Sequence, residues 1–109
     1  MMQKLISYKL VVFVPESQLE KVSSAIFNAG AGVIGNYDHC AFLSPGIGTY
    51  RPLKGAKPFK GKSGKLEKTK EFRLEVVVGS KIIKKVILAM KKAHPYEEVA
   101  YDVYPLANI

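Results

Sequence analysis

The chain has 109 residues, of which 48% are hydrophobic and 24% charged. This composition is typical of a soluble globular protein, and the length excludes two independent cores while allowing folding without a metal or a disulfide. The formal net charge of +8 lies almost entirely in residues 51–70, which carry eight basic residues and one acid, so the rest of the chain is nearly neutral.

The compartment is predicted from the only cysteine and from the N-terminal sequence. Cys40 excludes an internal disulfide and is typical of a reducing cytosol. The apolar run at residues 10–14 is too short for a signal peptide or a membrane span, because Lys9 precedes it and Pro15 ends it. We therefore expect a cytoplasmic protein with no membrane contact.

The first elements are predicted to be a strand and a helix. Residues 8–14 form a β-branched run bounded by Pro15, as in buried strands. Apolar residues then recur at the spacing of one helix face: Leu19, Val22, Ser23, Ile26 and Phe27. Ser17 and Glu20 have the spacing of a capping box, and Gly30 predicts the end of the helix.

A glycine string follows this helix at residues 30–35, GAGVIG. Its letters match a dinucleotide-binding fingerprint, but that motif follows a strand and opens a helix, which is the opposite order. We interpret the glycines as a helix end and a turn. A strand is predicted at residues 38–43, and Gly46 and Gly48 predict a strand bend, because no Lys-Ser/Thr ending of a phosphate loop follows them.

A basic segment rich in glycine and proline, at about residues 45–68, is predicted to be a loop. Its simplest interpretation is a solvated loop, and the alternative is contact with an anionic ligand or with nucleic acid. The candidate anion-contacting residues are Arg51, Lys54, Lys57, Lys60 and Lys62. Phe59 is the only aromatic residue among residues 51–70, whereas proteins that bind single-stranded nucleic acid stack its bases on several aromatic rings.

The second half of the chain repeats the first. A shift of 64 residues aligns residues 8–38 with residues 72–102 without a gap, with identity at nine of 31 positions. This predicts a strand at residues 72–78, then a helix with an apolar face, then a strand at residues 99–104. The helix face consists of Ile83, Val86, Ile87 and Met90. Ser80 is a candidate cap, and His94-Pro95 predicts the helix end.

Two such β-α-β units combine most simply into an α+β, ferredoxin-like sandwich: a four-stranded antiparallel sheet with two helices on one face. We expect one domain over residues 1–109. The other sheet face would then be uncovered, and we expect it to carry residues such as Val11, Phe13, Val76 or Val78. Because an exposed apolar patch of this kind is usually covered by another molecule, we predict a homo-oligomer.

Candidate metal ligands are His39, Cys40, His94 and Glu97, since both histidines and the only cysteine lie among them. The predicted topology places His39 and His94 a strand length apart, roughly 17 to 20 Å. A metal site would therefore need two subunits, and the alternative is that His94 and Glu97 are hydrogen-bonding groups of a loop or an interface. No catalytic triad or acid/base pair is recognisable.

Two sequence motifs resemble the Nif-three-like family (Ngg-interacting factor three), also called GTP cyclohydrolase I type 2 homologues. They are GNYDHCAFLSPGIGTYRPLKGAKPF in the first half and KKAHPYEEVAYDVYPL in the second. The resemblance is to the domain inserted in the longer bacterial members and covers roughly residues 7–106. It implies a fold like that of the PII signalling proteins and CutA, which is commonly trimeric. The metal-binding residues of the longer members lie in flanking halves that this sequence does not contain.

These observations together predict a small, non-enzymatic binding or regulatory module, a homo-oligomer and most simply a trimer, without a bound cofactor. A small, possibly anionic ligand or a protein partner would bind at clefts between subunits. The ligand or interface candidates are Tyr37, His39, Cys40, His94, Tyr96, Glu97 and Tyr101. The alternatives are a metal-binding protein or metal-dependent GTP cyclohydrolase-type hydrolase, and a nucleic-acid binder acting through the basic loop.

Overall fold

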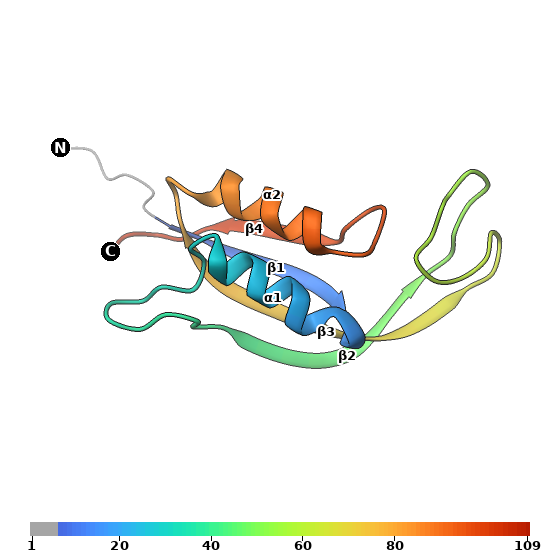
Figure 1. Cartoon of the computed structure of the whole chain (residues 1–109), viewed down its shortest axis with the longest axis horizontal. Coiled ribbons are helices and arrows are strands. Elements are labelled where there is room, and N and C mark those ends of the chain that lie inside the picture. The colour runs from blue at the N-terminus through green and yellow to red at the C-terminus, as the bar shows by residue number, and fades with distance from the viewer. Residues whose placement is uncertain (1–6) are drawn as a thin grey trace.

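The computed structural model describes residues 7–109, which form a four-stranded antiparallel sheet with two helices on one face (Figure 1). The elements in chain order are β1 (Ser7–Pro15), the 3-10 helix η1 (Glu16–Gln18), α1 (Leu19–Asn28), β2 (Phe42–Tyr50), β3 (Glu67–Gly79), α2 (Ile83–Ala93) and β4 (Tyr101–Pro105). The strand order is β2-β3-β1-β4. This confirms the predicted α+β, ferredoxin-like fold.

The core lies between the helices and one face of the sheet. Leu10 pairs with Val76 and Val12 pairs with Leu74 across β1 and β3, and all four side chains point towards the helices. Val22 and Ile26 of α1 and Val86 and Met90 of α2 complete the cluster. Neither helix is long and apolar enough to cross a membrane, and no other helix in the described part of the chain is.

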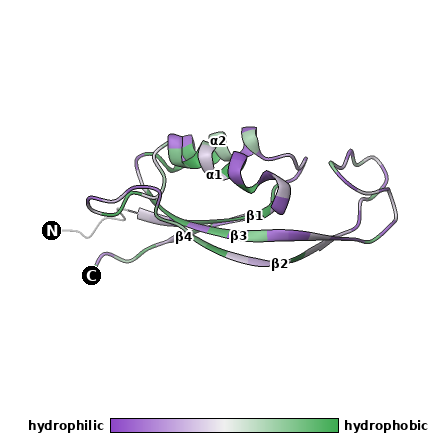
Figure 2. Cartoon of the chain, turned by 60° about the horizontal axis from the view of Figure 1, so that its bottom comes forward, coloured by the Kyte–Doolittle hydropathy of each residue, from purple (hydrophilic) through white to green (hydrophobic). Residues whose placement is uncertain are grey.

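The prediction that Val76 and Val78 lie on the uncovered face is wrong. Side chains alternate along a strand, and directly paired residues share a face, so the pairing of Val76 with Leu10 puts both valines in the core. Val11 and Phe13 do belong to the open face, which no helix covers (Figure 2).

Charged side chains surround the apolar residues of the open face. Val11 is fully buried and Phe13 is half-buried. Glu75 lies 3.8 Å from the Lys9 ammonium and 3.4 Å from the Arg73 guanidinium, and the Arg73 guanidinium lies 5.9 Å from the centre of the Phe13 ring. The open face of one copy therefore mixes charged with apolar side chains.

Strands β2 and β3 extend beyond the rest of the sheet as a two-stranded arm. Strand β1 ends opposite Glu71, whereas the β2–β3 pairing continues to Tyr50 and Glu67. The loop at the tip of this arm therefore spans residues 51–66, and the predicted loop at about 45–68 is too wide. Strand β2 also begins later than predicted and runs through both glycines without a break. An edge strand tolerates the proline and glycines that made it look irregular.

The helix ends are made by the backbone. No side chain caps the N-terminus of α1 or α2, so the predicted roles of Ser17, Glu20 and Ser80 are wrong. Gly30, at a φ of +108°, ends α1 as predicted, with the Ala31 N–H donating to Ile26 O at 3.0 Å. His94 ends α2 in an extended conformation, as expected before a proline, and β4 begins two residues later than predicted.

Candidate functional site

His94 anchors the loop of residues 94–100 to the end of β1. Its side chain is buried, and Nε2 lies 2.8 Å from the Phe13 carbonyl oxygen. Nδ1 accepts a hydrogen bond from the Tyr96 N–H at 3.2 Å. These partners assign the neutral tautomer with its proton on Nε2. Burial lowers the pKa of His94 from its ordinary value, and the Phe13 carbonyl and the Glu71 charge oppose this effect only in part.

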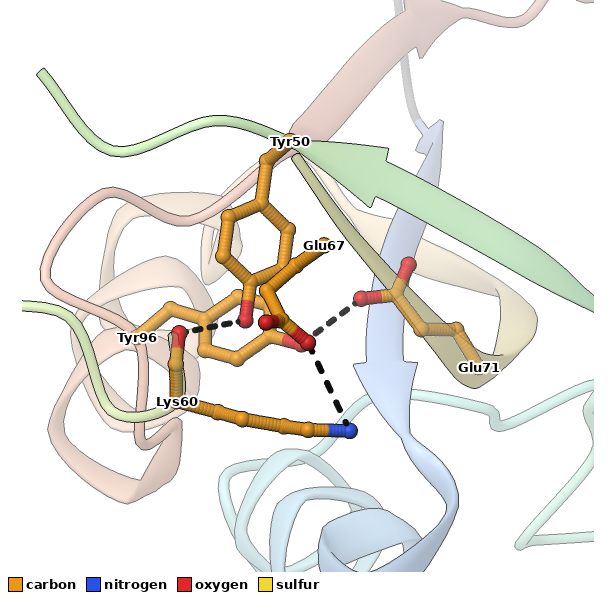
Figure 3. A network of polar contacts seen from close by, with 5 residues as sticks. All are labelled: Tyr50, Lys60, Glu67, Glu71 and Tyr96. Carbon is orange, nitrogen blue, oxygen red and sulfur yellow. Dashed lines mark hydrogen bonds and ion pairs between the residues drawn. The ribbon is translucent and has the colours of Figure 1, made fainter. Parts of the chain in front are cut away.

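Tyr96 carries the loop over the base of the arm. Its hydroxyl donates to Glu71 Oε2 at 2.8 Å, and its ring lies 5.8 Å from that of Tyr50, centre to centre (Figure 3). The ring of Phe59 lies 6.2 Å from it on the same measure. Burial, followed by the hydrogen bond to Glu71, raises the pKa of Tyr96 well above its ordinary value. The phenol is therefore a neutral hydrogen-bond donor and not a candidate base.

Polar contacts join the loop at residues 51–66 to the loop of residues 94–100 and to the strands of the arm. The Lys57 N–H donates to Glu97 Oε1 at 3.0 Å. The Tyr50 hydroxyl donates to Lys60 O at 2.7 Å, and the Lys60 ammonium lies 3.9 Å from Glu67 (Figure 3). The loop of residues 94–100, the loop of residues 51–66 and the strands of the arm thus meet at the base of the arm.

A groove of about 710 Å³ lies between these three segments, and we call it the arm groove. Most of its lining is apolar or aromatic, including Phe13, Ile47, Tyr50, Phe59, Phe72 and Tyr96. Two arginines and three glutamates also line it, and Glu71 and Glu97 already accept the hydrogen bonds described above. An apolar cleft with a few fixed polar groups is the usual form of a small-molecule site.

The basic loop residues are not gathered around the arm groove. Of the five candidates for anion contact, only Arg51 lines it. Lys54, Lys57 and Lys62 are exposed on the loop, and the Lys60 ammonium faces Glu67. The concentration of lysines in the sequence therefore does not make the arm groove positively charged.

The other candidates divide between the core and a distant turn. Tyr101 lies on β4, packs against the core, and has the Lys91 ammonium 5.1 Å from its ring centre. Tyr37, His39 and Cys40 lie in the turn of residues 30–41, where no strand forms except an isolated Ile34–Tyr37 bridge. This turn is at the opposite end of the molecule from the arm (Figure 1).

The structure therefore does not bring the metal candidates together within one copy. His39 has a φ of +57°, its Nδ1 lies 3.2 Å from Asp38, and its ring lies 4.6 Å from Phe27. Both ring nitrogens of His94 face backbone groups. Among residues 7–109, no group of three or more His, Cys, Asp or Glu side chains could hold a metal ion.

The sequence identified neither Glu71 as a site residue nor the packing of Gly48 against it. A Cβ atom at Gly48 would overlap the Glu71 side chain, so the glycine leaves the space that the Tyr96-bound carboxylate occupies. Glu71 lies at the point where β1 stops and the arm begins. The glycine spacing was a possible signal of close approach, but the sequence did not identify the partner.

Comparisons with known proteins identify the relatives of this chain. No protein-family model matches it. It is 58% identical over 98 residues to the GTP cyclohydrolase 1 type 2 homologue of Bacillus subtilis (strain 168), covering 90% of this chain and 26% of that protein. A solved Bacillus cereus protein described as related to NIF3 superposes with a TM-score of 0.82 at 48% identity, covering 98% of this chain and 27% of that one. The chain is a homologue of one segment of the Nif-three-like proteins.

This homology covers about a quarter of the length of these relatives. The same holds for the homologue from Halalkalibacterium halodurans, which is 54% identical over 101 residues, 93% of this chain and 27% of that protein. CutA from Archaeoglobus fulgidus superposes with a TM-score of 0.67 at 16% identity, covering 94% of this chain and 86% of that one. The likeness to CutA shows that this chain has a CutA-like fold.

Proposed function

We propose that this Nif-three-like chain is a non-enzymatic, self-associating binding module that holds a small ligand in the arm groove. The arm groove carries the proposal, because it combines aromatic walls with polar groups of Tyr96, Glu71 and Glu97. Their positions are fixed by the hydrogen bonds that they form. The half-buried Tyr96 and the neutral His94 support a binding role, since both are occupied by structural hydrogen bonds. The single free cysteine supports a cytoplasmic location.

Self-association is supported by the two outer strands. On β2, Phe42 is 68% exposed and Ile47 63%, and on β4, Tyr104 is 46% exposed. Large apolar side chains along free strand edges are typical contacts of an assembly. The resemblance to PII and CutA proteins favours a trimer. In such an assembly, Tyr37, His39 and Cys40 would contribute to the arm groove only from a neighbouring copy, because within one copy they lie at the opposite end.

The printed name of the curated relatives suggests an alternative, a metal-dependent GTP cyclohydrolase-type activity of the longer proteins. The chain covers only about a quarter of them, so that activity would require residues outside the matched segment. Stoichiometric zinc, manganese or iron in the purified protein would favour this alternative over the binding module.

The test combines light scattering with a ligand screen. We expect a trimer by size-exclusion chromatography with light scattering at about 0.15 M salt, where charges are screened beyond roughly 8 Å. Calorimetry and two-dimensional NMR with nucleotides and phosphorylated metabolites should then identify a compound that shifts the amide signals of residues 44–59 and 94–98.

Two variants localise that binding. Phe59→Ala removes a half-exposed groove wall and should weaken affinity roughly tenfold, as expected for the loss of an aromatic contact. Leu88→Ala, which removes an apolar side chain that is 69% exposed on α2, should leave affinity unchanged. A stable monomer, or a screen without any compound that depends on Phe59, would overturn the proposal.

A further inference from the structure

A second concave site of about 410 Å³ lies beside the arm groove, and we call it the basic pocket. It is bounded by the turn after β1, at residues 15–17, by residues 68–70 of the arm, and by Lys60 of the loop. Phe59 and Tyr96 line the basic pocket and the arm groove alike. The two hollows are therefore neighbours that share two aromatic side chains.

The charge of the basic pocket differs from that of the groove. Three lysines, Lys60, Lys68 and Lys70, and one acid, Glu16, line the pocket, whereas glutamates outnumber arginines in the groove. Within residues 7–109, neither Lys68 nor Lys70 forms a salt bridge. The Lys60 ammonium has only a long contact, 3.9 Å, with Glu67 (Figure 3). Two of the three cations thus have no anionic partner in the described structure.

Hydroxyl groups complete the basic pocket. The Thr69 hydroxyl faces the Tyr96 phenol, and its hydrogen bond lowers the pKa of Tyr96 slightly against the larger opposing effects. Ser17 contributes a second hydroxyl from the turn after β1. Ser17 is exposed, so its hydroxyl can donate to an oxygen-rich anion in the pocket.

We propose that the basic pocket binds the phosphate group of a small phosphorylated ligand. Lysine ammonium groups and hydroxyls are suitable donors to phosphate oxygens. The ligand would place its apolar or aromatic body across Phe59 and Tyr96 in the arm groove. The phosphate site is inferred from the basic pocket alone. The position of the rest of the ligand rests on the function proposed for the arm groove.

The test is an NMR titration of the full chain with inorganic phosphate and pyrophosphate at about 0.15 M salt. The wild type should show saturable shifts at Ser17, Lys60 and Thr69. The double variant K68Q/K70Q should weaken pyrophosphate binding at least tenfold. The matched control K54Q/K62Q removes the same charge from exposed loop positions outside the pocket and should change affinity less than twofold.

The outcomes separate the two proposals. Equal weakening in both double variants, or tighter binding of a single-stranded oligonucleotide that depends equally on all four lysines, would show general electrostatic attraction and overturn the phosphate site. Unsaturable shifts would also overturn it. Saturable phosphate binding without any Phe59-dependent ligand would support the basic pocket and refute the proposal for the arm groove. A Phe59-dependent ligand without saturable phosphate binding would support the arm groove and refute the basic pocket.

Discussion

The two turns that follow the helices occupy equivalent positions of the internal repeat but are anchored in different ways. The 64-residue shift aligns Gly30 with His94 and Gly32 with Tyr96. After α1, backbone groups hold the turn: the Gly32 N–H donates to Val77 O and the Cys40 N–H donates to Gly32 O, both at 2.8 Å. After α2, side chains hold the loop, through His94, Tyr96 and Glu97.

This difference explains why the candidate site lies at only one end of the molecule. The strands and helices of the two halves share identities because both bury the same face against one core. A turn anchored by its backbone leaves its exposed side chains, such as Tyr37, without a cavity to line. A loop anchored by side chains places aromatic and acidic groups against the arm and so creates the groove. The groove thus lies where the chain departs from the repeat.

Gly32→Ala should produce the largest effect, because it breaks the backbone-anchored turn. Gly32 has a φ of +82°, and an added Cβ would lie 2.9 Å from the Cys40 carbonyl oxygen. Cys40 is held in place because its N–H donates to Gly32 O. We expect a loss of about 3 kcal/mol in the free energy of unfolding. Urea denaturation at one fixed protein concentration measures it, because self-association also changes apparent stability.

The control for this prediction is Gly35→Ala. Gly35 also has a positive φ, +57°, but an added Cβ meets nothing within 4 Å. It should therefore lose only about 1 kcal/mol, the cost of the left-handed conformation. Equal losses in the two variants would mean that the close approach to Cys40 does not matter.

His94→Ala should produce the next largest effect, because it removes the side-chain anchor of the second loop. The Phe13 carbonyl and the Tyr96 N–H would both lose their partner, and a small cavity would remain. We expect a loss of about 2 kcal/mol. His39→Ala is the matched control at the other turn, where the side chain is exposed, and should change stability by less than about 0.5 kcal/mol. Similar values would refute the contrast between the turns.

The elements of the repeat were predictable from the sequence because each depends on a local pattern. The β-branched runs and the apolar helix faces identified β1, β3, α1 and α2, and Gly30 marked a helix end by its tolerance of positive φ. The extension of β2 to Tyr50 was missed, since Pro45 and two glycines interrupt the alternation that a strand usually shows. The face of Val76 was missed because it follows from pairing with Leu10, which is not a local property.

The site was predictable only in part, for the same reason. His94, Tyr96 and Glu97 form a cluster of polar residues directly after a helix, which made them candidates. Their partners were not recognisable. Glu71 and Tyr50 reach Tyr96 through the register and length of the β2–β3 arm, and the sequence of a hairpin with a loop of 16 residues does not define that register. Thr69 was missed on the same grounds.

Acid should weaken the side-chain anchor gradually. The unfolded chain protonates His94 near its ordinary pKa of 6.5, whereas burial lowers the pKa in the folded state. Between these two values the unfolded state binds more protons, so stability is full above about pH 6.5 and falls as the pH decreases towards the folded pKa. The slope should stay below about 1.4 kcal/mol per pH unit. The Glu71 carboxylate, which accepts the hydrogen bond from Tyr96, opposes the lowering of the His94 pKa and so makes this pH dependence smaller.

The comparison that isolates this effect is His94→Gln, measured by urea denaturation between pH 7.5 and 5. The variant has no titrating group at this position, so its stability should change less over this range than that of the wild type. Protonation at Nδ1 also removes the acceptor of the Tyr96 N–H, so the amide signal of Tyr96 should move with the histidine titration. Parallel pH profiles of the variant and the wild type would show that other groups cause the acid sensitivity.

Glu97→Ala should produce the smallest effect, because it loosens the loop without touching the core. Glu97 is exposed, and its carboxylate holds only the Lys57 N–H. Global stability should change by less than about 0.5 kcal/mol, while hydrogen exchange of the Lys57 amide should accelerate. Glu98→Ala removes the same charge from the next groove-lining residue and should leave that amide unchanged. Unaltered Lys57 exchange in Glu97→Ala would mean that the arm and its aromatic contacts alone position the basic loop, and that the side-chain anchoring after α2 ends at Tyr96.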